Sequence, residues 1–168
     1  VNETLMTILR KNVRVADQVE GDLEAQISAL GIMEKRINDI LNDYQLRDLS
    51  ELSKAVCRRT ELATRQEITN LPDGTYKASV ATDGLSEQPI EIMVEITIKE
   101  DTVKVDFSGS SQQVAKAINC PLCYTRAMTS YAIKSALAPE LPNNDGALRA
   151  LTVVAPEGSI VNPQHPAS

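Results

Sequence analysis

The stretch that decides the fold is Ile90-Glu91-Ile92-Met93-Val94-Glu95-Ile96-Thr97-Ile98-Lys99, in which aliphatic and mostly polar residues alternate. Successive side chains of a β-strand point to opposite faces, so a period of two separates an apolar face from a polar one. The apolar face comprises Ile90, Ile92, Val94, Ile96 and Ile98. The alternation predicts a half-buried strand of an antiparallel sheet.

The segments on either side of this stretch show the same alternation. Val103, Val105 and Phe107 continue it after a tight turn at Glu100-Asp101, and Tyr76, Ala78 and Val80 precede it. Three such runs with short connections predict a β-meander. The Leu71-Pro72-Asp73-Gly74 turn marks the start of this region. Residues 71–168 are therefore predicted to form an antiparallel sheet plus a helix.

The region before this turn has a helical period. Its apolar positions recur at steps of three and four and form one stripe: Val19, Leu23, Ile27, Leu30, Met33, Ile37, Leu41 and Tyr44. Asp48-Leu49-Ser50-Glu51 has the spacing of a capping box, so a second helix is predicted from there to about Thr69. Two long helices with a short link predict a helical hairpin over residues 1–70.

The region after the meander contains one further helix and a final strand. Pro121 suits the first turn of a helix that should stop before Pro139, and a strand is expected around Leu148–Val154. The predicted fold class is α+β. It consists of a long helical hairpin followed by an antiparallel β-meander with one further helix and a final strand.

Composition excludes two classes of partner. The net charge is −6, no basic stripe is visible, and the chain has few aromatic residues, which argues against nucleic-acid binding. No apolar run approaches the roughly 20 residues that cross a bilayer. Three cysteines, Cys57, Cys120 and Cys123, cannot all pair internally, which favours the reducing cytoplasm.

Few side chains offer chemistry of their own. His165 is the only histidine and is expected to be solvated or lightly packed, and no metal site is predicted. Cys120-Pro121-Leu122-Cys123 has redox or zinc spacing, but buried small side chains at a helix start explain it more simply. The Ser108-Gly109-Ser110-Ser111 segment is either an ordinary turn or a ligand-facing loop. Asp106 before it is either a solvated carboxylate or a charge that lines a pocket.

Several segments together resemble the hydantoinase B/oxoprolinase family, in the family's order and spacing. They are 12–14, 21–26, 71–76, 105–114, 118–122, 142–146, 155–159 and 162–167. The resemblance spans nearly the whole chain. This sequence departs from the family at Ala117, where the family commonly has glycine, and its cysteine pair is not a family hallmark. Family members are considerably longer, so the chain is expected to be a fragment.

The resemblance implies part of an ATP-dependent enzyme of the N-methylhydantoinase and 5-oxoprolinase type. Such an enzyme activates a small cyclic amide, a hydantoin or 5-oxoproline, and opens its ring with water. ATP and Mg²⁺ would be held by an A-type partner subunit, and any further divalent metal would lie outside this segment. The fragment alone is expected to be inactive. One alternative is a subunit of an ATP-dependent ketone carboxylase of the acetone or acetophenone type. Another is a structural, subunit-contacting segment without a site of its own.

The same resemblance indicates candidate site residues among the polar positions of these motifs. Asp106 and Arg126 are the expected catalytic residues. The expected substrate-binding residues are Arg14, Asp22, Gln26, Ser108, Asn119 and Asn144. An arginine can hold a carboxylate or phosphate through two hydrogen bonds, and asparagine can stabilise a developing oxyanion.

Overall fold

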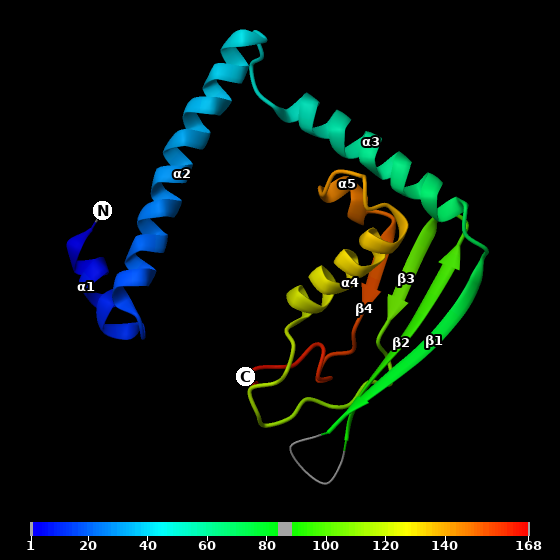
Figure 1. Cartoon of the computed structure of the whole chain (residues 1–168). Coiled ribbons are helices and arrows are strands. Elements are labelled where there is room, and N and C mark those ends of the chain that lie inside the picture. The colour runs from blue at the N-terminus through cyan, green and yellow to red at the C-terminus, as the bar shows by residue number, and fades with distance from the viewer. Residues whose placement is uncertain (1, 84–88, 168) are drawn as a thin grey trace. The chain divides into compact units, whose positions relative to one another are not determined.

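The computed structural model describes residues 2–83 and 89–167 and divides the chain into two compact units, Val1–Glu51 and Leu52–Ser168. The first unit contains α1 (Glu3–Asn12) and α2 (Ala16–Asp43). The second contains nearly all of α3 (Ser50–Thr69) and every later element (Figure 1). Antiparallel pairing of the two long helices and a domain boundary at residue 70 stay predictions.

The first unit is a pair of helices held together by an ion-pair network. Asn2 caps α1 by accepting hydrogen bonds from the N–H groups of Thr4 and Leu5. Arg10 of α1 donates to Glu20 of α2, with 2.7 Å between Nε and Oε2, and also pairs with Glu3. Helix α1 was not predicted from the sequence as a separate element. Helix α2 was predicted, and it begins three residues before Val19 and ends one residue before Tyr44.

The apolar stripe of α2 lies largely in solvent. No residue of this helix is buried, and Ile27, Leu30 and Met33 each expose more than half of their surface. The helix was predicted correctly, but α1 covers little of its apolar face. None of the helices in the described part of the chain combines the length and the apolar character that a bilayer crossing requires.

The meander is confirmed. β1 (Gly74–Thr82), β2 (Ile90–Lys99) and β3 (Thr102–Asp106) pair antiparallel in chain order. On the inner face, Val94, Ile96 and Ile98 pack against the buried core. The alternation in the sequence therefore identified both the strand and its buried side.

Helices α3 and α4 (Leu122–Leu137) contribute to the core of the sheet unit. Ile68 of α3 is fully buried and clusters with Val103 and Val105 of β3. Ile133 and Leu137 of α4 pack against the same cluster. Asp48 accepts a hydrogen bond from the N–H of Ser50 at 2.8 Å, which agrees with its predicted capping role at the start of α3.

The last strand differs in extent and direction from the prediction. A short helix, α5 (Asp145–Leu148), ends at the first residue of the predicted strand, and β4 is confined to Leu151–Val154. β4 pairs parallel to β3, so the four-stranded sheet is mixed, in the order β1-β2-β3-β4. The chain makes this crossover through α4, because parallel neighbours cannot be joined by a tight turn.

Candidate functional site

The polar face of the sheet is the best candidate for a binding surface. The cross-strand register places its side chains in two rows. One row contains Lys77, Glu95 and Asp106, and the next contains Thr75, Thr97, Lys104 and Thr152. The opposite face carries the core, so these polar groups lie on the side of the sheet away from Ile68 and Val105.

Two ion pairs organise this face. Lys77 Nζ lies 2.7 Å from Glu95 Oε2, and Lys104 Nζ lies 2.8 Å from Asp106 Oδ2. The lysines are well exposed, so each pair contributes little to stability. The pairs place two carboxylates and two ammonium groups side by side.

Asp106 is the more shielded of the two carboxylates. Its oxygens accept hydrogen bonds from Lys104 and from the N–H of Ser108, which lies 2.9 Å from Oδ1. Lys104 and then Ser108 lower the pKa of Asp106 from 3.8 to about 2. Asp106 is therefore ionised at neutral pH and cannot act as a general acid, and so low a pKa makes it a weak general base. Its favoured role is a fixed negative charge.

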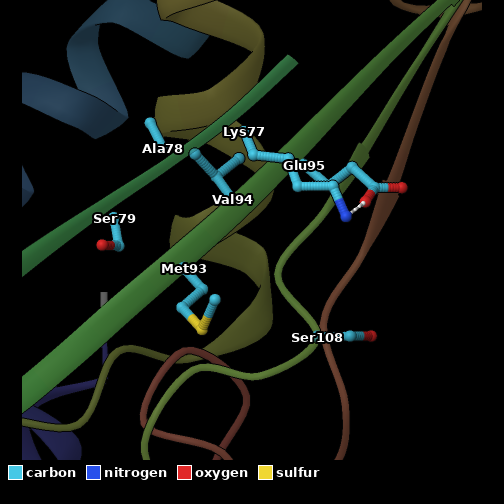
Figure 2. A pocket seen from close by; sticks show the side chains of 7 residues that line it. All are labelled: Lys77, Ala78, Ser79, Met93, Val94, Glu95 and Ser108. Carbon is cyan, nitrogen blue, oxygen red and sulfur yellow. Dashed lines mark ion pairs between the residues drawn. The ribbon is translucent and has the colours of Figure 1, made fainter. Parts of the chain in front are cut away.

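A hollow of about 300 Å³ lies beside this face, lined by Lys77, Ala78, Ser79, Met93, Val94, Glu95 and Ser108. Figure 2 shows the Lys77–Glu95 pair spanning β1 and β2, and Ser108 on the turn that follows β3. The hollow therefore presents an ammonium, a carboxylate and two hydroxyls. Such groups can orient a small polar ring.

The Ser108–Ser111 loop extends the sheet beyond the end of β3. The Ser110 hydroxyl accepts from Met93 N at 3.0 Å and donates to Met93 O at 3.1 Å. Ser111 forms two hydrogen bonds with the backbone of Glu91. Since the N–H groups of Ser108, Ser110 and Ser111 all have partners within the chain, they do not form an anion cradle. Of the three serines, only Ser108 lines the hollow.

Arg126 does not join Asp106. It is exposed on α4 and lines a different hollow, together with residues of β4. The side chain of Asp106 lies on the polar face, whereas α4 packs against the opposite face through Ile133 and Leu137. The sheet thus separates the two predicted catalytic residues, and a joint role for them stays a prediction.

Asn119 and Asn144 both hold backbone in place. The side chain of Asn119 accepts from Val114 N at 2.9 Å and donates to Val114 O and Lys116 O. Asn144 caps α5 by accepting from Gly146 N, and its Nδ2 donates to Thr60 Oγ1 of α3 at 3.0 Å. These contacts give both asparagines a structural role. Substrate binding by them stays a prediction.

Arg14, Asp22 and Gln26 lie in the first unit and are exposed. Arg14 belongs to the link between α1 and α2, and Asp22 and Gln26 are one turn apart on α2. Their predicted contact with substrate also stays a prediction.

Metal-binding groups do not cluster in the described residues. Within 2–83 and 89–167, no three His, Cys, Asp or Glu side chains gather as a metal site requires. Cys57, Cys120 and Cys123 are free thiols. The described residues therefore supply no ready set of three ligands for a divalent cation.

Lys77, Glu95 and Lys104 were missed as site residues by sequence reasoning. Each of the three occupies a polar position in the alternating pattern of its strand. The sequence could therefore have predicted that their side chains point to the polar face. Which of them meet depends on register: Lys77 pairs with Glu95 because those two positions are opposite each other in the β1–β2 ladder. A slip of one residue would turn the apolar side chains to the solvent face, so burial of that apolar face specifies the register.

Comparison with known proteins identifies the family. Residues 1–168 match the Hydantoinase B/oxoprolinase family. The chain is 34% identical over 167 residues to an uncharacterized protein of Methanocaldococcus jannaschii, and 34% identical over 179 residues to the candidate B subunit of a D-/L-hydantoinase from Pseudomonas sp. (strain NS671). Each comparison covers 99% of this chain. The chain belongs to the hydantoinase B/oxoprolinase family.

A solved structure shares the fold. The crystal structure of the ATP-dependent caprolactamase from Pseudomonas jessenii superimposes with a TM-score of 0.85 at 23% identity, over 99% of this chain and 29% of that chain. The chain spans 29% and 30% of the length of the Methanocaldococcus and Pseudomonas relatives. It is thus a fragment by comparison with proteins of this family.

Proposed function

We propose that this chain is part of an ATP-dependent cyclic amidohydrolase, which opens the ring of a hydantoin, 5-oxoproline or a similar lactam together with an ATP-binding A-type partner. The observation that carries the proposal is the family match over all 168 residues. Relatives named for lactam substrates support it. A 5-oxoprolinase of Dictyostelium discoideum matches 96% of the chain, and the beta chain of the Pseudomonas jessenii caprolactamase matches 98%.

The chemistry explains why such an enzyme consumes ATP. An unactivated amide is a poor electrophile, and phosphorylation of its oxygen creates a good leaving group. In our proposal the partner holds ATP and Mg²⁺, because the N–H groups of Ser108, Ser110 and Ser111 have partners within the chain and no lysine follows at phosphate-loop spacing. The three free cysteines favour a cytoplasmic location.

The hollow beside Ser108 is the proposed contact for the ring. A cyclic amide offers one N–H donor and one C=O acceptor. Glu95 can accept from the former, and Lys77 or the Ser108 hydroxyl can donate to the latter. Asp106 keeps Ser108 in place through the backbone hydrogen bond at 2.9 Å. Asp106 would then act by positioning Ser108.

The proposal is tested with the complete two-subunit enzyme assayed against a panel of lactams and ketones. We expect ATP hydrolysis to depend on a lactam and to proceed without bicarbonate. Turnover of a ketone that requires bicarbonate would instead show a carboxylase, the alternative suggested by a TM-score of 0.84 to acetone carboxylase. Within the lactam assay, Glu95→Gln should raise the KM for the ring, with Glu91→Gln on the same strand as the control.

A structural role is the second candidate, and the exposed stripe of α2 favours it. Leu30 and Met33 expose 59% and 51% of their surface, as a helix does when its partner is missing. We propose that this stripe packs against another part of the enzyme assembly. Leu30→Glu should weaken assembly measured by light scattering, whereas the same charge placed by Ser28→Glu on the opposite side of the helix should leave it unchanged. Normal assembly of the Leu30→Glu protein would remove this candidate.

A further inference from the structure

The outer edge of β4 has backbone groups without a strand partner in the described residues. β4 is an edge of the sheet, next to β3. Val103 N donates to Ala150 O at 3.0 Å, and Phe107 N donates to Val154 O at 2.9 Å, so alternate residues direct their peptide groups at β3. The alternation turns the N–H and C=O groups of Leu151 and Val153 toward the outside.

This edge lacks the charge and the proline that often block strand addition, although β4 is only four residues long. Proteins protect exposed edges with lysine, proline or a bulge. At the other edge, β1 carries Lys77, and nearly all of its residues are exposed. β4 reads Leu-Thr-Val-Val, without charge or proline, and its Leu151 and Val153 are half-buried. The β4 edge is therefore suited to receive another strand.

A cationic groove borders the same edge. A hollow of about 330 Å³ lies between α4 and β4, lined by Arg126, Ser130, Leu148, Leu151, Thr152 and Val153. A second hollow of about 330 Å³ shares Ser130 and Leu148 with it and includes Lys134. Both hollows have a cation and no carboxylate in their lining, although the chain carries a net charge of −6. Arg126 has no ion-pair partner within residues 2–83 and 89–167.

We propose that the β4 edge binds an extended acidic segment of a partner polypeptide. The segment adds a strand through backbone hydrogen bonds to Leu151 and Val153, and one of its carboxylates binds Arg126 through two hydrogen bonds. A second copy of this chain fits less well, because two-fold pairing of β4 edges brings the two Arg126 side chains toward each other. This inference goes beyond the proposed function and does not depend on it.

The experiment uses the 168-residue chain, labelled for NMR, and short capped peptides as probes. A peptide of alternating glutamate and valine should bind and slow the hydrogen exchange of the Leu151 and Val153 amides. A peptide of alternating lysine and valine should bind about tenfold more weakly, because it repels Arg126. The proposal is overturned if the peptide slows hydrogen exchange in β1 instead of β4, or if both peptides bind equally well.

Two variants separate the two contributions. Val153→Pro removes an N–H group that points away from β3, so the hydrogen bonds between β4 and β3 remain. This variant should weaken binding of the acidic peptide about five- to tenfold. Ala81→Pro on the β1 edge is the matched control and should leave binding unchanged. Arg126→Gln, on the surface of α4, should also weaken binding about tenfold and remains informative if Val153→Pro fails to fold. Loss of binding with Arg126→Gln but not with a folded Val153→Pro would indicate a simple carboxylate site and contradict strand addition.

Discussion

Gly146 shows how a single residue can set the distance between two elements. It is buried at the start of α5, where that helix meets α3. A Cβ atom at this position would lie 1.9 Å from the carbonyl oxygen of Cys57 and 2.9 Å from its Cα. Backbone atoms cannot move aside as a side chain tip can, so only glycine permits this approach. Asn144 reinforces the contact through its hydrogen bond to Thr60.

Replacing Gly146 by alanine should therefore destabilise the sheet unit. We expect Gly146→Ala to lower the free energy of unfolding by about 2 to 3 kcal/mol, because α5 must move away from α3. Gly31→Ala is the matched control, since a Cβ at Gly31 meets nothing within 4 Å and alanine favours a helix by about 1 kcal/mol. Chemical denaturation measures both. If the Gly146→Ala and native proteins were equally stable, the contact between α5 and the Cys57 backbone would be looser than these distances indicate.

Asp106 should make stability depend on pH in the acid range. Its pKa falls from 3.8 to about 2 on folding, so the unfolded chain binds the proton more tightly. The resulting stabilisation is fully present above about pH 4 and is lost as the pH falls through 2. Allowing for solvent screening, we expect it to amount to about 1 kcal/mol. Asp106→Asn should remove this part of the pH dependence, and an NMR titration of the Asp106 carboxylate checks the pKa directly.

At the scale of elements, the Ser108–Ser111 loop extends the β3 side of the sheet. β3 ends at Asp106, but β2 continues back to Ile90 and would leave its peptide groups at Glu91 and Met93 unpaired. The Ser110 and Ser111 hydroxyls and the Ser111 N–H bind those groups. Gly109 adopts a φ of 94°, which lets the loop pass close to the Met93 side chain.

Two serine variants in this loop should behave differently. Ser110→Ala leaves the Met93 N–H and C=O without their partner and should cost about 1 to 3 kcal/mol of unfolding free energy. Ser108→Ala should leave stability nearly unchanged, because Ser108 is exposed, but should raise the KM of the complete enzyme for its lactam. Thermal unfolding and steady-state kinetics distinguish the two effects. Loss of stability in both variants would argue that Ser108 is also structural.

At the scale of the whole molecule, most of α3 belongs to the sheet unit. The boundary between the two compact units lies at Glu51 and Leu52, near the start of this helix. Ile68 near the end of α3 is fully buried in the core beneath β3. An ion-pair network adds to this attachment: Glu61 pairs with Arg65 and Arg149, and Arg65 pairs with Asp101.

This attachment predicts that Ile68→Ala will unfold the sheet unit selectively. Removing a fully buried isoleucine side chain costs about 2 to 5 kcal/mol. Hydrogen exchange should accelerate at β2 and β3 but not in α2. Ile32→Ala is the control, since Ile32 of α2 is 64% exposed and its loss should change neither unit. Equal acceleration in α2 and β2 would mean that the two units unfold together.

Sequence reasoning succeeded where the signal is local and failed where it depends on distant partners. Strict alternation in Ile90–Lys99 predicted β2 and its buried face, and steps of three and four predicted α2. The helix α1 was missed, although Leu5, Met6 and Leu9 recur at helical spacing and Asn2 precedes them as a capping residue. Ser108 lines one hollow and Arg126 lines another, across the sheet from Asp106, so the expected roles of both residues stay predictions. Sequence distance carries no information about which face of a sheet a later helix will cover.

The sequence by itself determined the period of each main element, the α+β class and the family, because these follow from neighbouring residues and from motif order. Only the tertiary structure decided that β4 lies parallel to β3, that Lys77 meets Glu95, and that Gly146 touches α3. The physical reason is that alternation and helical period are properties of a short stretch of chain. Register, strand direction and close approach are settled only when segments far apart in the chain pack against one another.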